Sequence, residues 1–326
     1  FCGDNEVIGI SLDNTDNKEL TLINYDRRNQ ALEKVVKAAD DTRAFWPSSP
    51  CNGPLDFDGS WDDDTKGDMH YWDVWFGGKK FDGYYDVNPR FCSEFGFQSF
   101  PSYPLLESVI THNGTKKPAD GDFNLASEVM EHHQRNDRGN SIILSTMFRY
   151  FHLPSSFKHQ LYISQIQQAF AIQYAVEYWR SKRPSCMGTL YWQLQDNWPV
   201  ASWSSIEYGG KWKALHYVAK QFYAPQRLVF QDDEESLTLI AINDQVEDIQ
   251  GEVVIEKVFY GGNIEHLQTL HRATMKQQQV TSLYQQEKIS PNQGRSFLLR
   301  ANFTCESGET FEAFHIPTPF KRAILC

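Results

Sequence analysis

A single carboxylate stands in the middle of a strongly aromatic stretch of this chain. Glu94 lies among four phenylalanines, which are Phe91, Phe95, Phe97 and Phe100. Desolvating an unpaired ionised carboxylate costs several kcal/mol. A fold that contains this stretch must therefore expose Glu94 to water, pair it with another group, or place it in a functional site. Two interpretations meet that constraint: an acid that points outward from a core strand, and a functional carboxylate.

A second glutamate stands in a comparable setting at the start of the chain, which opens FCGDNEVIGI. Glu6 is followed by an apolar stretch, and the amide residue Asn5 directly precedes it. Cleavage of a glycosidic bond needs two carboxyl groups. One delivers a proton to the departing oxygen, and the other attacks or supports the anomeric carbon. The two motifs together favour a glycoside hydrolase.

The pair Asn5-Glu6 and the run Ser93-Glu94-Phe95-Gly96 resemble the active-site motifs of the retaining glycosidases that include β-galactosidase, β-glucuronidase and β-mannosidase. Two further runs, Trp-Pro-Ser-Ser-Pro at 46–50 and Tyr-Trp-Gln-Leu-Gln-Asp-Asn-Trp-Pro at 191–199, favour the β-mannosidases over their relatives. The resemblance covers residues 1 to about 225 well and the remainder loosely. Related stretches lie at 43–50, 68–75, 188–199 and 203–217.

The resemblance implies a role for each motif residue. Glu94 is expected to be the nucleophile, Glu6 the general acid and base, and Asn5 the residue that holds the sugar 2-hydroxyl. Retention of configuration requires the two carboxyl groups to lie about 5–5.5 Å apart. Positions Phe1 and Asp4 depart from the usual motif, which has Trp and Asn there.

Four aromatic or imidazole residues complete the expected sugar site. His70 and Trp72 alternate along one predicted strand and so point to the same face, where the resemblance places them around the axial 2-hydroxyl of mannose. Trp46 is expected in the cleft wall, and Trp192 at a strand end as the floor of the sugar site. Ordinary core packing of these aromatic side chains is the alternative interpretation of all four positions.

Predicted strands and helices alternate over the first two thirds of the chain, which is typical of a parallel α/β architecture. Helices are predicted at 24–40, near 124–135, and at 155–182 and 213–222; strands are predicted at 43–46, 70–75, 91–97 and 187–194. The resemblance implies that residues 1–225 are the C-terminal half of a TIM (β/α)8 barrel. Glu6 would then end the fourth strand and Glu94 the seventh, at the barrel face where catalytic residues lie.

The pattern changes after Pro225. Short strand candidates separated by turn residues follow, near 228–230, 237–242, 251–260 and 296–303. This spacing predicts an immunoglobulin-like β-sandwich over residues 226–326. The fold class predicted for the whole chain is therefore α/β followed by all-β.

Charge and composition exclude several classes of partner. The formal net charge of −11 gives no electrostatic case for binding nucleic acid or an anionic membrane. No run approaches the roughly 18–20 apolar residues of a membrane span. The six cysteines lack metal-ligand spacing, and the expected chemistry needs no metal or cofactor. Pairing of Cys305 with Cys326 is left open, as is use of the Asn113 and Asn302 glycosylation acceptor motifs.

The expected activity is removal of terminal β-linked mannose from oligosaccharides, so the expected partner is a mannose-containing oligosaccharide. The resemblance also implies that an N-terminal part of the same polypeptide precedes Phe1, so no compartment is assigned and the isolated segment is expected to be inactive. Three alternatives stay open: a β-glycosidase of the β-galactosidase or β-glucuronidase type, an endo-β-mannosidase, and a carbohydrate-binding fragment without turnover.

Overall fold

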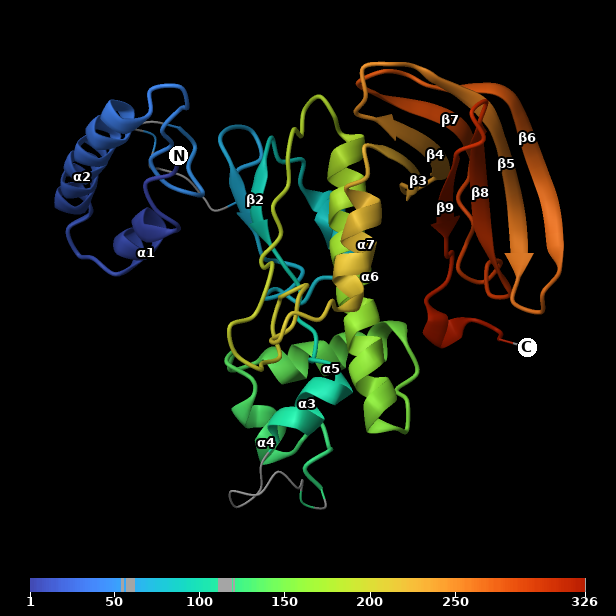
Figure 1. Ribbon diagram of the computed structural model, residues 1–326, viewed down its shortest axis with the longest axis horizontal. Helices are drawn as coiled ribbons and strands as arrows, with labels where there is room; N and C mark the ends of the chain where they lie inside the picture. The colour runs from blue at the N-terminus through green and yellow to red at the C-terminus, as the bar shows by residue number, and fades with distance from the viewer. Residues whose placement is uncertain (54–55, 57–61, 111–118, 120, 326) are drawn as a thin grey trace. The chain divides into compact units, whose positions relative to one another are not determined.

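The computed structural model describes residues 1–53, 56, 62–110, 119 and 121–325. The acceptor motif at Asn113 and the terminal Cys326 lie outside the described residues. The chain divides into two compact units. The first comprises residues 1–96 with 184–192, and the second comprises residues 97–183 with 193–326. Figure 1 shows the order of the helices and strands along the chain.

Two helices open the first unit, α1 (Val7–Asp13) and α2 (Lys18–Ala39). The prediction of a helix at 24–40 is confirmed, although α2 begins earlier because the side chain of Asn17 accepts a hydrogen bond from the backbone N–H of Leu20 and caps it. The buried positions of α2 are Tyr25 and Asn29. The helix was predicted from an apolar stripe along its last turns, Leu32, Val35, Val36 and Ala39, and none of these four is among the buried residues.

Parallel pairing connects the segments of the first unit that carry the sequence motifs. Strands β1 (Met69–Tyr71) and β2 (Cys92–Phe95) form a two-stranded parallel sheet in which His70 pairs with Glu94. An isolated parallel bridge from Cys92 to Thr189 continues this order beyond β2. Two further parallel bridges, from Cys2 to Trp46 and from Asn5 to Ser49, join the segments 2–5 and 46–49 to each other. The described residues form no closed barrel. Between the two strands lies a 3₁₀ helix, η1 (Phe81–Asp86).

The predicted strands of the first unit are shorter in the structure than in the sequence analysis. The strand expected at 70–75 ends at Tyr71, and the segments around Trp46 and Thr189 make single bridges rather than full strands. Each of these segments therefore leaves the parallel pairing soon after its motif residue.

The second unit begins with helices. They are α3 (Tyr103–Val109), α4 (Glu128–His132), α5 (Gly139–Tyr150), α6 (Phe157–Ser181) and α7 (Ala214–Phe222). The helices predicted at 155–182 and 213–222 are confirmed as α6 and α7, which pack side by side (Figure 1). The helix expected near 124–135 is confirmed as the short α4, whereas α3 and α5 were not predicted. Helix α6 buries the apolar band that predicted it, from Leu161 to Val176.

Two antiparallel sheets complete the second unit. One has the strand order β3 (Gln226–Asp232), β4 (Ser236–Asn243), β7 (Gln279–Glu287), and the other β6 (Ile264–Met275), β5 (Ile249–Phe259), β8 (Phe297–Cys305), β9 (Thr310–His315). A shared core joins them, with Leu228 and Leu239 from the first sheet and Val253 and Phe303 from the second. The four predicted strands are confirmed as β3, β4, β5 and β8. A 3₁₀ helix, η2 (Phe320–Arg322), follows β9.

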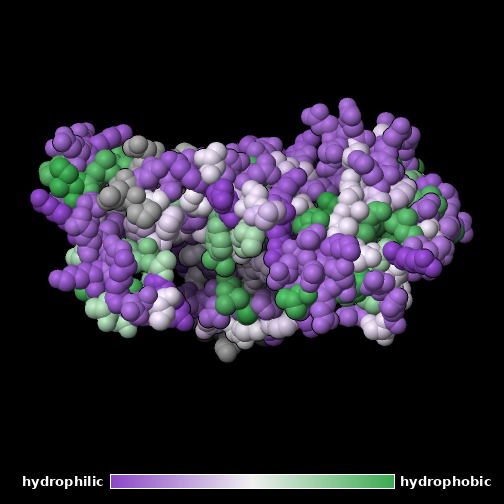
Figure 2. Space-filling view, turned by 90° about the horizontal axis from the view of Figure 1, so that it is seen from above, coloured by the Kyte–Doolittle hydropathy of each residue, from purple (hydrophilic) through white to green (hydrophobic). Residues whose placement is uncertain are grey.

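The surface agrees with the acidic, polar composition. Figure 2 shows hydrophilic residues over most of one face, with apolar residues scattered among them. None of the helices in the described part of the chain has both the length and the hydrophobicity of a membrane span.

Candidate active site

Glu6 sits at a strained point of the backbone. Its φ of 61° and ψ of 6° place it in the left-handed region, which residues with a side chain rarely adopt. Its backbone N–H donates to the carbonyl of Ser49 at 2.8 Å, and its own carbonyl accepts the hydrogen bond from Ile10 that starts α1. Residues held in such conformations concentrate at functional sites, because the surrounding structure must over-determine them.

Asp4 holds the turn that presents Glu6. Its carboxylate accepts hydrogen bonds from the hydroxyl groups of Tyr25 and Ser48, at 2.8 and 2.6 Å. It also forms an ion pair with Arg28 at 2.7 Å. Burial, with a smaller contribution from the adjacent carboxylate, raises the pKa of Tyr25 to about 12. The departure from the usual motif at Asp4 therefore has a structural account: the acid ties the Glu6 turn to α2 through Tyr25 and Arg28.

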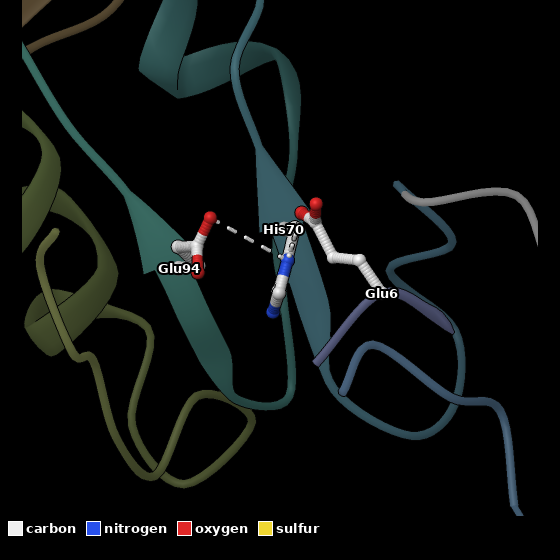
Figure 3. A group of neighbouring side chains, drawn as sticks. All are labelled: Glu6, His70 and Glu94. Carbon is white, nitrogen blue, oxygen red and sulfur yellow. Dashed lines mark hydrogen bonds and ion pairs between the residues drawn. The ribbon is translucent and has the colours of Figure 1, made fainter. Parts of the chain in front are cut away.

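His70 lies between the two glutamates (Figure 3). Its Nδ1 is 2.7 Å from Oε1 of Glu6 and 3.8 Å from Oε1 of Glu94. One carboxylate oxygen of Glu6, Nδ1 of His70 and one carboxylate oxygen of Glu94 all lie within 4.8 Å of one another. The side chain of His70 is 1% exposed, whereas those of Glu6 and Glu94 are 22% and 13% exposed. The carboxylates thus face a partly open site above a buried imidazole.

The environment of Glu94 differs from that of Glu6. Burial raises the pKa of Glu94, and the negative charge of Glu6 acts in the same direction. The imidazole of His70 and the indole N–H of Trp72, which donates to Oε1 of Glu94 at 3.2 Å, oppose that rise. Two carboxyl groups in unequal surroundings can hold different protonation states at one pH.

A cluster that the sequence analysis did not identify lies behind His70. The Oδ1 atom of Asp68 accepts from the indole N–H of Trp46 at 2.8 Å and from the backbone N–H of Cys51 at 2.9 Å. Its Oδ2 atom accepts from the hydroxyl groups of Ser49 and Ser93, each at 2.6 Å. The available sequence signal was weak: Asp68 stands two residues before His70, directly before β1, and nothing near it in the sequence indicates its donors.

The remaining predicted site residues lie on neighbouring segments. The side chain of Asn5 is exposed, and its backbone is bridged to Ser49 beside Glu6. Trp192 is 43% exposed, and its backbone N–H donates to the carbonyl of Phe95 at 2.8 Å, one residue after Glu94. The structure thus brings Glu6, Glu94, His70 and Trp72 into contact. Trp46 points its indole N–H at Asp68, and Asn5 and Trp192 stand on the flanking segments.

Glu6, His70 and Glu94 also form a set of potential metal ligands. Two ligands of a tetrahedral or octahedral ion with bonds near 2.1 Å lie about 3.0–3.4 Å apart. The 2.7 Å separation between Nδ1 of His70 and Oε1 of Glu6 is shorter and is that of a charge-assisted hydrogen bond. The observed arrangement therefore fits a hydrogen-bonded pair of Glu6 and His70, with Glu94 3.8 Å from the same nitrogen, better than a metal site.

Comparison with curated proteins shows a consistent similarity. The β-mannosidase of Capra hircus is 36% identical over 239 residues, which are 67% of this chain and 26% of that protein. β-Mannosidase B of Emericella nidulans is 28% identical over 201 residues, which are 60% of this chain and 22% of that protein. The chain thus spans about a quarter of the length of the curated relatives it matches. No protein-family model matches it.

Solved structures agree. The crystal structure of a β-D-mannosidase from Dictyoglomus thermophilum matches 99% of this chain and 38% of its own, with a TM-score of 0.85 and 25% sequence identity. The exo-chitosanase of Amycolatopsis orientalis matches 89% of this chain and 34% of its own, with a TM-score of 0.62 and 13% identity. The second comparison bears on the fold alone.

Proposed function

The chain is a β-mannosidase homologue that corresponds to a part of those proteins, and from this premise we propose that it carries the catalytic centre of a retaining exo-β-mannosidase. The substrate is terminal, non-reducing, β-linked mannose on an oligosaccharide. The reaction is a double displacement that uses two glutamates.

One observation carries this proposal: oxygens of Glu6 and Glu94 approach within 4.8 Å, across a histidine that contacts both side chains. Retaining glycosidases hold their carboxyl groups about 5–5.5 Å apart, whereas inverting enzymes need about 6.5–9.5 Å to admit a water. In the proposed reaction Glu94 attacks the anomeric carbon while Glu6 protonates the leaving oxygen. Glu6 then activates the water that releases mannose.

The nucleophile must be ionised to attack, and burial works against that state at Glu94. The N–H of Trp72 supports the ionised form, and so does His70 when its imidazole carries a positive charge. We assign substrate contacts to Asn5, at the 2-hydroxyl, and to the aromatic surfaces of Trp46, Trp72 and Trp192. His70 completes this set at the base of the site.

We further propose that the parallel segments of the first unit are strands of a TIM barrel, within a catalytic domain that spans residues 1–225. Two groups of parallel segments support this: 2–5 with 46–49, and β1 with β2 and the segment at Thr189. A preceding part of the same polypeptide would supply the other strands. Residues 226–326 form the second proposed domain.

The second proposed domain is an immunoglobulin-like sandwich. The domain has seven strands, β3 to β9. One sheet has the order β3-β4-β7, and the other has the order β6-β5-β8-β9. Alternation of consecutive strands between two packed antiparallel sheets in this way is typical of immunoglobulin-like topologies.

The test uses the complete polypeptide encoded by the gene and a panel of aryl β-glycosides with manno, galacto, gluco and glucurono configurations. We expect selective hydrolysis of the β-mannoside, with β-mannose as the first product by NMR. Glu94→Gln should reduce kcat by about 10⁴-fold or more, as removal of a nucleophile does. Glu33→Gln, on the α2 surface, is the matched control and should retain wild-type turnover.

Three outcomes would contradict the proposal. Preference for another sugar would favour a related β-glycosidase, and cleavage only within mannan chains would favour an endo-acting enzyme. Sugar binding without turnover would favour a carbohydrate-binding protein. The 326-residue chain alone is expected to be inactive, so hydrolysis of an aryl β-mannoside by this segment would refute the need for a preceding part.

A further inference from the structure

Asp68 uses its full capacity to accept hydrogen bonds. A carboxylate offers about four lone-pair sites, and here four donors fill them: the indole of Trp46, the backbone N–H of Cys51, and the hydroxyl groups of Ser49 and Ser93. Each hydroxyl has one proton to donate. Ser49 Oγ also lies 3.1 Å from Ser93 Oγ, and Ser93 Oγ lies 3.2 Å from the carbonyl of Met69. The contacts to the charged Asp68 are shorter, at 2.6 Å each, so we assign both protons to Asp68.

The direction of the Ser49 proton determines whether Ser49 donates a hydrogen bond to the imidazole of His70 or accepts one from it. Its Oγ lies 3.0 Å from Nε2 of His70. Because the hydroxyl proton points to Asp68, Ser49 presents lone pairs to the ring, and the hydrogen bond requires a proton on Nε2. When the imidazole is neutral, its other nitrogen, Nδ1, then carries no proton.

Nδ1 is the atom that faces the glutamates (Figure 3). A lone pair on Nδ1 and an ionised Oε1 of Glu6 would repel each other at 2.7 Å, so one proton must lie between them. That proton resides either on Glu6, beside a neutral ring, or on Nδ1, beside a carboxylate. The pair therefore holds one proton at the position from which a general acid would deliver it.

We propose that Asp68, acting through Ser49, is a positioning residue that fixes His70 as the Nε2–H tautomer, so that His70 and Glu6 share the proton that is delivered to the leaving oxygen. This inference rests on the function proposed above. It assigns a task to Asp68, Ser49 and Ser93, which lie outside the set of substrate-contacting residues.

The proton balance follows from that assignment. In the first step the shared proton forms an O–H bond to the leaving oxygen while the glycosidic C–O bond breaks and Glu94 bonds to the anomeric carbon. This leaves Glu6 as a carboxylate beside neutral His70. In the second step water attacks the same carbon and the bond to Glu94 breaks. The proton released by the water then returns to the pair of Glu6 and His70.

Ionisable groups reach His70 from three elements. Glu6 precedes α1, Glu94 comes from β2, and Asp68 acts through Ser49 from the residue before β1. The thiols of Cys2 and Cys51 lie near Asp68, and burial raises their pKa, which keeps them neutral at physiological pH.

The deciding variant is Asp68→Asn in the complete polypeptide. The amide NH₂ of asparagine can donate to Ser49, which frees the serine proton for Nε2 and moves the ring proton to Nδ1. Nδ1–H of the neutral ring then stabilises ionised Glu6. This proton cannot be delivered to the leaving oxygen, because the ring has no proton on Nε2 and would become an imidazolate, so the pair no longer acts as an acid. We expect kcat/KM for phenyl β-mannoside to fall about 100-fold, within the range that a positioned general acid contributes. With 2,4-dinitrophenyl β-mannoside, whose leaving group needs no proton, the fall should be less than about 3-fold.

Two further readouts separate this role from a merely structural one. The alkaline limb of the kcat/KM profile for the phenyl substrate should move to lower pH, because the donor proton is held less firmly. Asp73→Asn removes an equally charged residue that pairs with Lys79 on the surface, and it should leave both substrates unaffected. Ser49→Ala removes the acceptor of Nε2–H and should repeat the selective loss, which keeps the test available if Asp68→Asn fails to fold.

Equal losses with both substrates, or an unmoved alkaline limb, would overturn the tautomer assignment while leaving the hydrolase intact. Failure of the proposed function looks different. In that case the wild-type polypeptide hydrolyses neither mannoside, or Glu94→Gln still turns over the dinitrophenyl substrate.

Discussion

The indole Nε1 of Trp72 donates a 3.2 Å hydrogen bond to Oε1 of Glu94. Trp72 directly follows β1 and Glu94 lies within β2, so the two parallel strands bring this donor and acceptor together. The bond matters because burial raises the pKa of Glu94, and a donated N–H lowers it.

Trp72→Phe tests that balance. Loss of the N–H raises the pKa of Glu94 further, so the acidic limb of kcat/KM should move to higher pH. The sign follows because the attacking form is the ionised one, and activity falls as pH drops through the pKa of Glu94. A pH–rate profile of the complete polypeptide with an aryl β-mannoside measures the shift. A limb that stays in place or moves to lower pH would contradict it.

Asp4→Asn should destabilise the fold, although it restores the residue usual in the motif. The substitution removes the charge that pairs with Arg28 and weakens the hydrogen bonds from Tyr25 and Ser48. We expect a loss of about 1–2 kcal/mol in the free energy of unfolding. The measurement is thermal denaturation. Glu33→Gln is the control, since it breaks an exposed pair with Lys37 on α2 and should leave Tm unchanged.

Trp192→Ala should weaken substrate binding. The indole is 43% exposed on the segment next to β2, where a sugar ring can stack on it. We expect KM to rise about 10-fold, in line with the energy of one aromatic contact, with a smaller change in kcat. Trp212→Ala removes an indole of similar exposure, 46%, from the second unit and should leave KM unchanged. Equal effects of the two substitutions would argue against a sugar contact at Trp192.

Lys213 offers a test of pH-dependent stability in the second unit. Burial lowers its pKa to about 8, with Asp196 and Glu207 opposing the shift. Between pH 8 and the usual lysine range the unfolded chain therefore holds more protons than the folded one, and the contribution of Lys213 to stability rises with pH. Relative to Lys213→Met, the wild type should gain about 2 kcal/mol between pH 7.5 and 10. Paired Tm measurements at both pH values check this, and a constant difference would refute it.

The two glutamates could be predicted because their local sequence is unusual. A lone acid among phenylalanines and an Asn-Glu pair before an apolar run each require an explanation in any fold. The long helix α6 was equally predictable, since its apolar band is continuous. Both features are encoded within a short window of sequence.

Other features depend on residues far apart in the chain. The role proposed for Asp68 depends on donors from two distant segments, 46–51 and β2, and no local pattern indicates that they converge on one carboxylate. Strand β6 was missed because most of its side chains are polar and at least partly exposed, so it lacks a clear apolar alternation. The apolar stripe of α2 did not predict its contact face, because this helix contacts the Glu6 turn through Tyr25 and Arg28 instead.

The left-handed backbone at Glu6 bears on how such a protein would diverge. Glycine and asparagine tolerate that conformation far better than glutamate does, so a lineage released from selection for turnover would gain stability by either replacement. The identity of the residue at this position is therefore informative about the function of a relative. Under the proposed function, the relatives that keep glutamate at this left-handed position are expected to be the ones that retain turnover.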